Sequence, residues 1–159
     1  MTSADTSPDW AFVVSELIQA RQTVLPKRLM DPGPDAAQTQ AILAAAAAAP
    51  DHMQLQPWRF ILVPAGQRAT LAEVFARALS ERDPQATPEQ LAQAREKAFR
   101  APLLMLAVVD GARGDPEVDL NERILSAGCA VQNMLLMATA LGFGSALTSG
   151  KALKSHTLR

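Results

Sequence analysis

The chain contains little of what several classes of protein require. Its 159 residues include a single cysteine, Cys129, which excludes an internal disulfide and a cysteine-based zinc cluster. The 15 basic and 16 acidic residues leave a net charge of −1, too little basic character to hold nucleic acid by counterion release. Because cysteine is scarce and the N-terminus shows no signal peptide, we expect a cytoplasmic protein.

The sequence also lacks a membrane span and the common catalytic motifs. Its most apolar run, residues 124–147, is interrupted by polar side chains such as Ser126 and Asn133, which favours a buried helix. A phosphate loop, HExxH and GxSxG are all missing, and neither His52 nor His156 has metal-ligand spacing around it. We therefore expect no metal and no catalytic acid, base or nucleophile, so that any chemistry would belong to a cofactor.

A dinucleotide-binding fingerprint is only partly present. Gly142-Phe143-Gly144 has its first two glycines, but Leu147 stands where the third is required. The motif also follows an expected helix instead of a strand, so we reject a Rossmann site.

The remaining sequence predicts one α+β domain over residues 1–159, with residues 1–6 disordered. Hydrophobic residues make up 48% of the chain, enough for a core of ordinary size. The periodicity and the capping residues predict a helix from Ser7-Pro8 to near Arg21, helices ending near 49 and over 67–80, 88–99 and 121–141, buried strands over 60–63 and 102–109, and a short strand over 145–150. We expect the 121–141 helix to be buried nearly all round, including against a partner chain in an oligomer.

Two segments are candidates for binding. Residues 48–60 join an alanine-rich helix to a strand, and Pro50 and Pro57 keep the backbone between them irregular, which is typical of a binding loop. Arg21-Gln22-Thr23 places a cation and a hydroxyl at a helix end, where it either holds an anion or is an ordinary basic C-terminus.

Other residues leave two interpretations open. The alanine block 44–49 is either a tightly packed core helix or a smooth surface for close approach of a ligand. Trp58 is favoured as a core or interface anchor over a ring-stacking residue. Cys129 is favoured as a core residue over a redox group, and the charge between 68 and 100 as a solvated face over a recognition surface.

Four spaced motifs together resemble the flavin-dependent nitroreductase family. Arg21-Gln22-Thr23 is similar to its Arg-Arg-Ser motif, and residues 49–60, with Ala49-Pro50-Asp51-His52 and Gln56-Pro57-Trp58, are similar to its loop and strand. Residues 126–130 and 141–144 resemble its central helix and Gly-rich end. The match covers roughly residues 10–155 and is closest to the short branch with Pro-Asp-His in the loop.

The resemblance implies a nitroreductase-like fold, with a central mixed sheet flanked by helices, in a homodimer that binds FMN at the subunit interface. It implies an FMN-dependent NAD(P)H oxidoreductase that passes hydride from NADH or NADPH to nitroaromatics, quinones or similar small acceptors. By position, Arg21 and Thr23, with Gln22 between them, would meet the phosphate and ribityl chain. Ala48 and His52 would approach the flavin from the partner, and Leu147, Thr148 and Ser149 would supply the remaining contacts.

Three departures from the family pattern keep alternatives open. Thr148 stands where this branch often has arginine, Gln22 replaces an arginine, and the family continues beyond the position of Arg159, so that the C-terminal part of the fold is expected to be missing. The alternatives are a flavin-binding homologue without turnover and a cofactor-free interaction domain.

Overall fold

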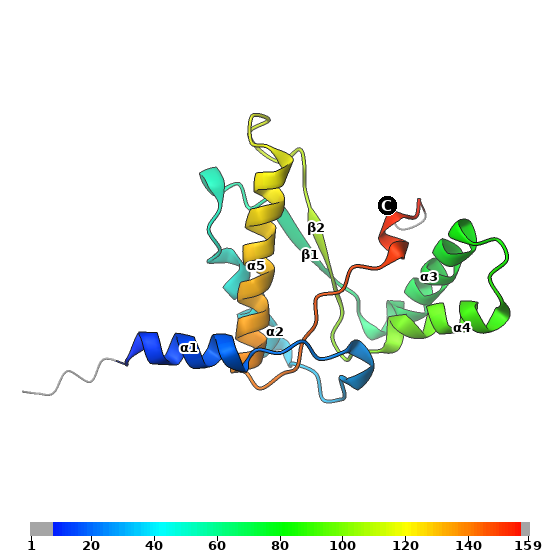
Figure 1. Cartoon of the computed structure of the whole chain (residues 1–159), viewed down its shortest axis with the longest axis horizontal. Helices are drawn as coiled ribbons and strands as arrows, with labels where there is room; N and C mark the ends of the chain where they lie inside the picture. The colour runs from blue at the N-terminus through cyan, green and yellow to red at the C-terminus, as the bar shows by residue number, and fades with distance from the viewer. Residues whose placement is uncertain (1–7, 157–159) are drawn as a thin grey trace, which may run out of the picture.

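The computed structural model describes residues 8–156 (Figure 1). Its α-helices and strands are α1 (Trp10–Ala20), α2 (Ala36–Ala47), β1 (Trp58–Leu62), α3 (Arg68–Arg82), α4 (Pro88–Glu96), β2 (Met105–Val109) and α5 (Leu120–Ala140). Short 3-10 turns lie between them: η1 (Pro26–Arg28), η2 (His52–Gln54), η3 (Ala65–Gln67), η4 (Lys97–Phe99) and η5 (Lys151–Lys154). The predicted α+β class is confirmed.

The helix boundaries follow from capping residues. α4 carries the predicted capping box, in which the Gln90 amide donates to the Thr87 side chain and the Gln90 side chain accepts from the Thr87 amide. α1 begins at Trp10 instead of after Ser7, because Asp9 accepts the Phe12 amide at 3.1 Å and caps the helix. The expected disorder of residues 1–6 concerns a segment outside the described residues.

The sheet pairs β1 with β2 in antiparallel register, from Trp58 opposite Val109 to Leu62 opposite Met105. Residues 145–150 do not form the expected strand. Their only described pairing is a parallel bridge between Ser145 and Thr23, and the residues that follow are largely exposed. β1 is also less buried than expected, since Ile61 and Leu62 are exposed in the single chain.

The main core lies where α2 packs against α5. Ile42 and Ala46 of α2 meet Ala130, Met134 and Ala138 of α5. Trp58 and Phe60 from β1 pack against this cluster, which confirms the core role of Trp58. The small side chains let the two helices approach closely. The interpretation of the alanine block as a packed core helix holds for Ala46, whereas other alanines of α2 are exposed.

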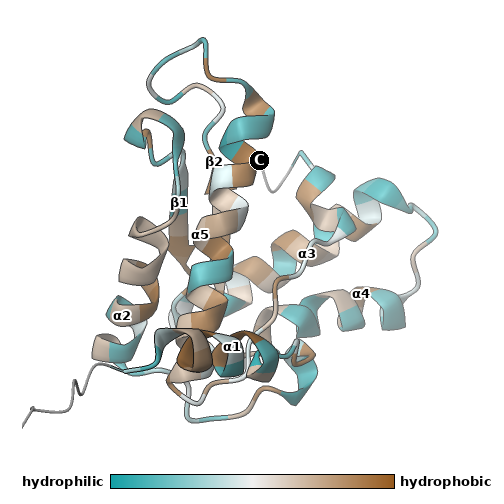
Figure 2. Ribbon diagram, turned by 60° about the vertical axis from the view of Figure 1, so that its left-hand side comes forward, coloured by the Kyte–Doolittle hydropathy of each residue, from teal (hydrophilic) through white to brown (hydrophobic). Residues whose placement is uncertain are grey.

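α3 and α4 form a hairpin that projects away from α5 (Figure 1). Leu71, Ala72 and Ala98 make a second small core there. The outer surface is polar (Figure 2), as expected for a solvated face, but Arg68 is an exception because it is buried. Its guanidinium donates to the carbonyls of Val63, Ala98 and Pro102, and desolvation lowers its pKa.

Large apolar side chains remain exposed on α1 and α5. α1 has no buried residue, and Trp10, Phe12 and Ile18 are mostly solvent-accessible. On α5, Ile124 is 50% and Leu125 is 70% exposed, so this helix is not buried nearly all round within one chain. Exposed apolar residues are common on single chains, and these belong to two different helices.

Candidate functional site

The first candidate motif is held beside the chain that follows α5. Arg21 is the residue that ends α1, and its amide donates to the Leu17 carbonyl at 3.2 Å. Thr23 forms the parallel bridge with Ser145, and the Val24 amide donates to the Ser145 carbonyl at 3.0 Å. We call residues 21–24 together with 145–149 the arginine strip.

The arginine strip depends on a glycine. A Cβ at Gly144 would lie 3.0 Å from Cγ2 of Val24 and 3.2 Å from Cδ2 of Leu29. Any side chain there would press the two segments apart. The Gly-rich end of the helix therefore lets the Arg21-Gln22-Thr23 segment meet Ser145, which precedes Leu147, Thr148 and Ser149 in the chain.

The arginine strip contains a cation and several hydroxyl groups, which are donor types that bind phosphate. Arg21 is half-buried, whereas the side chains of Thr23, Thr148 and Ser149 lie at the surface. The Ser145 hydroxyl is buried and has no hydrogen-bond partner among the described residues. A cation and several hydroxyl groups on two adjoining segments, one hydroxyl unpartnered among the described residues, are of the types that bind an anionic group with several acceptor oxygens. Leu147 adds an exposed apolar wall.

The second candidate motif is an irregular loop near the other end of α5. His52 lies in η2, and its Nδ1 is 2.6 Å from Oε2 of Glu122. The backbone has positive φ at Met53 (57°), Gln54 (55°) and Gln56 (46°). Residues other than glycine rarely adopt this conformation. Such a conformation persists only where the surroundings fix it.

Four contacts fix this loop. The Asp51 carboxylate accepts the Gln56 amide, and the carbonyl of the buried Pro57 accepts the Asp110 amide at 2.7 Å. The Leu55 side chain packs against Gly114, which has φ 72°, and occupies the space that a Cβ at that position would need. The fourth, the His52–Glu122 pair, is solvent-exposed and adds little to the stability of the loop. The irregular loop that the two prolines predict is confirmed.

Arg123 is a site-supporting residue that the sequence did not indicate. It is 1% exposed, and its guanidinium donates to the carbonyls of Val118 (2.9 Å), Asp115, Arg113 and Asp110. Arg123 thereby holds together the segment between β2 and α5, residues 110–118. This segment packs against the irregular loop that contains His52 through Gly114 and Leu55. An acidic residue in the first turn of a helix is the usual complement to the helix dipole, so Glu122 gave no separate signal, and the carbonyl partners of Arg123 come near it only on folding.

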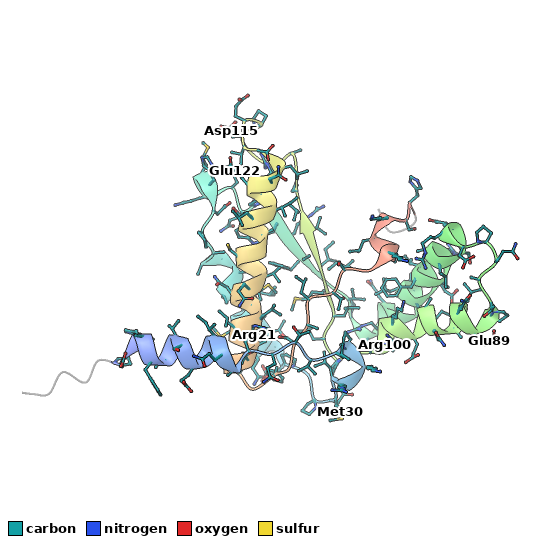
Figure 3. All side chains as sticks on the ribbon, in the orientation of Figure 1. Arg21, Met30, Glu89, Arg100, Asp115 and Glu122 are labelled. Atoms are coloured by element: carbon teal, nitrogen blue, oxygen red, sulfur yellow. The ribbon has the colours of Figure 1, made fainter. Side chains whose placement is uncertain are left out.

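The two motifs lie far apart within one chain. Figure 3 shows Arg21 and Glu122 near opposite ends of α5, a helix of 21 residues that is about 30 Å long. Ala48 ends α2, on the way to the His52 loop. The structure therefore brings the predicted residues together in two groups, the arginine strip and the Ala48–His52 segment, and does not unite them.

Other features leave these two groups as the best candidates. Among residues 8–156, no cluster of three or more His, Cys, Asp or Glu side chains is placed to hold a metal, and no helix is long and apolar enough to cross a bilayer. A hollow of about 320 Å³ lies between α3 and α4, lined by Glu73, Arg77 and Arg95 among others. None of the predicted site residues lines it.

Comparison with known proteins assigns the family. Residues 18–155 match the model of the nitroreductase family. The chain is 37% identical over 132 residues to the protein named "Putative NAD(P)H nitroreductase YdjA" of Escherichia coli K12, covering 83% of this chain and 70% of that protein. This chain therefore belongs to the nitroreductase family, as the four motifs predicted.

Solved structures of low sequence identity show the same fold. A nitroreductase-like family protein of Bacillus cereus superposes with a TM-score of 0.74 at 19% identity, covering 99% of this chain and 78% of the other. The FMN-dependent nitroreductase NfnB of Mycobacterium smegmatis, solved in complex with NADPH, gives a TM-score of 0.73 at 18% identity, covering 95% and 81%. The predicted nitroreductase-like fold is confirmed.

Proposed function

We propose that this chain is an FMN-dependent NAD(P)H oxidoreductase. The observation that carries the proposal is the pairing of Thr23 with Ser145, which brings the Arg21-Gln22-Thr23 motif beside the residue that follows the Gly-rich motif 141–144. Family membership supports the same reaction class, and the described residues offer no cluster for a metal that would favour other chemistry. FMN, when bound, supplies the hydride-accepting and hydride-donating atom, so no protein nucleophile is required.

In this proposal the arginine strip holds the phosphate and ribityl chain. Arg21 supplies the fixed positive charge, and Thr23, Thr148 and Ser149 supply hydroxyl donors, with Gln22 beside them. The Ser145 hydroxyl, which has no hydrogen-bond partner among the described residues, gains one. Leu147 contributes an apolar contact to the flavin side. Charge-assisted hydrogen bonds of this type contribute more than neutral ones.

The remaining contacts come from a second copy of the chain, with each chain acting as a single domain. One FMN does not reach from Arg21 to His52 within one chain, because the length of α5 separates them. A homodimer resolves this separation by placing Ala48 and His52 of one copy against the arginine strip of the other. The exposed apolar residues of α1 and α5 (Figure 2) supply the kind of surface such a dimer buries.

The acceptors we propose are nitroaromatics, quinones or similar small molecules, with NADH or NADPH as the electron donor. These are the acceptors that the resemblance to the nitroreductase family implies, and family membership supports this substrate class. We further propose that the enzyme acts in the cytoplasm, on the basis of its single cysteine.

The proposal is tested by adding FMN to the purified protein, removing free flavin and recording the visible spectrum. A bound flavin that bleaches under NADH or NADPH without oxygen supports it. A protein that retains no flavin at micromolar FMN overturns it.

A second candidate is a flavin-binding homologue without turnover. The observation that favours it is Thr148, which leaves Arg21 without the second cation that the resemblance leads us to expect. Bound FMN that neither nicotinamide reduces is the result that selects this candidate.

A further inference from the structure

The pair formed by His52 and Glu122 has a geometry that stability does not explain. Nδ1 of His52 and Oε2 of Glu122 are 2.6 Å apart, although the two side chains are 57% and 50% exposed. Pairs this exposed contribute little to folding, because water and salt screen them and two side chains lose freedom. The chain already fixes the loop through Asp51, Pro57 and Leu55.

The carboxylate determines where the imidazole proton lies. An ionised glutamate only accepts hydrogen bonds, so the short contact requires the proton on Nδ1. In the neutral ring Nε2 is then an acceptor, and it is the ring nitrogen that Glu122 does not engage. A carboxylate behind an imidazole fixes both the tautomer and the ring orientation in other sites where histidine binds a ligand.

We propose that Glu122 is a positioning residue for His52, holding the ring with its proton on Nδ1 so that Nε2 is offered to the flavin bound by the second copy. This inference rests on the proposed function, because it assigns a role within the same flavin site. Glu122 touches no part of the cofactor in this account and acts only through the imidazole. The adjacent Arg123 supports the arrangement by fixing the 110–118 connection against the same loop.

The first test uses flavin-free protein, so it does not depend on activity. Imidazole ¹⁵N chemical shifts at pH 8 report which ring nitrogen carries the proton, and His156, the second of the two histidines, is an internal reference. We expect the proton on Nδ1 of His52 in the wild type and in Glu122→Gln, whose amide oxygen still accepts. In Glu122→Ala the proton moves to Nε2. Glu117→Ala removes an exposed glutamate from the 110–118 connection and should leave the proton position of both histidines unchanged.

The second test is FMN titration of the same variants together with His52→Ala. Loss of one oriented hydrogen bond corresponds to about fivefold weaker binding, expected for Glu122→Ala and for His52→Ala, with a smaller change in Glu122→Gln. Because Glu122 acts through His52, the double variant His52→Ala/Glu122→Ala binds FMN no more weakly than His52→Ala alone.

Two results overturn the inference while leaving the proposed function intact: a wild-type protein that binds FMN but carries the His52 proton on Nε2, and additive losses in the double variant. A wild-type protein that binds no FMN overturns the proposed function and this assignment together.

Discussion

Thr23 and Ser145 form a parallel bridge, although α2, both strands and α5 lie between them in the sequence. The bridge joins the last residue of the Arg21-Gln22-Thr23 motif to the residue after Gly142-Phe143-Gly144. Gly144 permits it, since a Cβ there would meet Val24 at 3.0 Å. The phosphate-binding role proposed for this surface leads to two predictions about its charge.

Arg21→Ala should weaken FMN binding by roughly tenfold to a hundredfold, the range for loss of a charge-assisted hydrogen bond. Folding stability should change little, because Arg21 contributes its backbone and not its side chain to the end of α1. Flavin titration and chemical denaturation measure the two effects separately. Arg82→Ala, at the distant end of α3, is the matched control, and equal FMN affinity of the two variants would refute the phosphate role.

Thr148→Arg should strengthen FMN binding by roughly tenfold, because it adds a cation to the proposed phosphate-binding strip on an exposed segment that tolerates a long side chain. The gain should shrink as salt is added, since exposed charges are screened. Titration at two salt concentrations measures both effects. Thr148→Gln adds length without charge and should show no gain, and a similar gain in that variant would argue against the electrostatic explanation.

Arg123→Met should lower the free energy of unfolding by about 2–4 kcal/mol, because it leaves buried carbonyl groups of the 110–118 connection without donors. Denaturant unfolding measures the loss. Arg113→Met is the control, since the Arg113 side chain is exposed and only its carbonyl meets Arg123. Equal stability of the two variants would show that the carbonyl contacts of Arg123 are dispensable.

The α3–α4 hairpin should carry a small pH-dependent contribution from Glu73 and Arg95. The guanidinium donates to both carboxylate oxygens at 2.8 and 3.1 Å, and this hydrogen bonding lowers the pKa of Glu73 from its ordinary 4.5. A carboxyl whose pKa is lower in the folded state stabilises the fold above the unfolded value and loses that contribution as the pH falls through the folded value. Because both side chains are largely exposed, the effect is small.

The measurement is the difference in unfolding free energy between the wild type and Glu73→Gln, followed from pH 7 to pH 3. The difference should be largest at neutral pH and shrink below about pH 4.5. Glu16→Gln, at an exposed position of α1, is a control outside the ion pair. A difference that grows as the pH falls would contradict the assignment.

Local signals in the sequence predicted the helices well. The capping box joins Thr87 to Gln90, and the length of α5 follows from the spacing of its apolar residues. Both depend on residues close together in the sequence, so both can be predicted from it. The resemblance likewise predicted the family, because Arg21-Gln22-Thr23 and the Pro50-to-Trp58 segment occur in the right order.

Features that depend on distant residues were not predicted. Ile61 and Leu62 have the apolar character of a buried strand, yet what covers them is decided by tertiary packing. The sequence did not indicate Arg123 or Glu122, because their partners are loop carbonyls and a histidine brought close only by folding. The roles assigned to Ala48, His52 and the arginine strip stay predictions.

The central claim is that each flavin site is built from two chains, and complementation of two damaged chains tests it most directly. Arg21→Glu reverses the charge at the phosphate side, and Ala48→Phe blocks the exposed end of α2. Each homodimer should bind FMN poorly. Heterodimers, co-expressed with two different affinity tags and purified on both, should regain about half of the wild-type FMN sites, because one site inherits both intact halves.

If each site lay within a single chain, every chain of the heterodimer would carry its own damage and no FMN binding would return. Recovery of about one bound FMN per heterodimer is the result that the two-chain site predicts, and no recovery in verified heterodimers would contradict it.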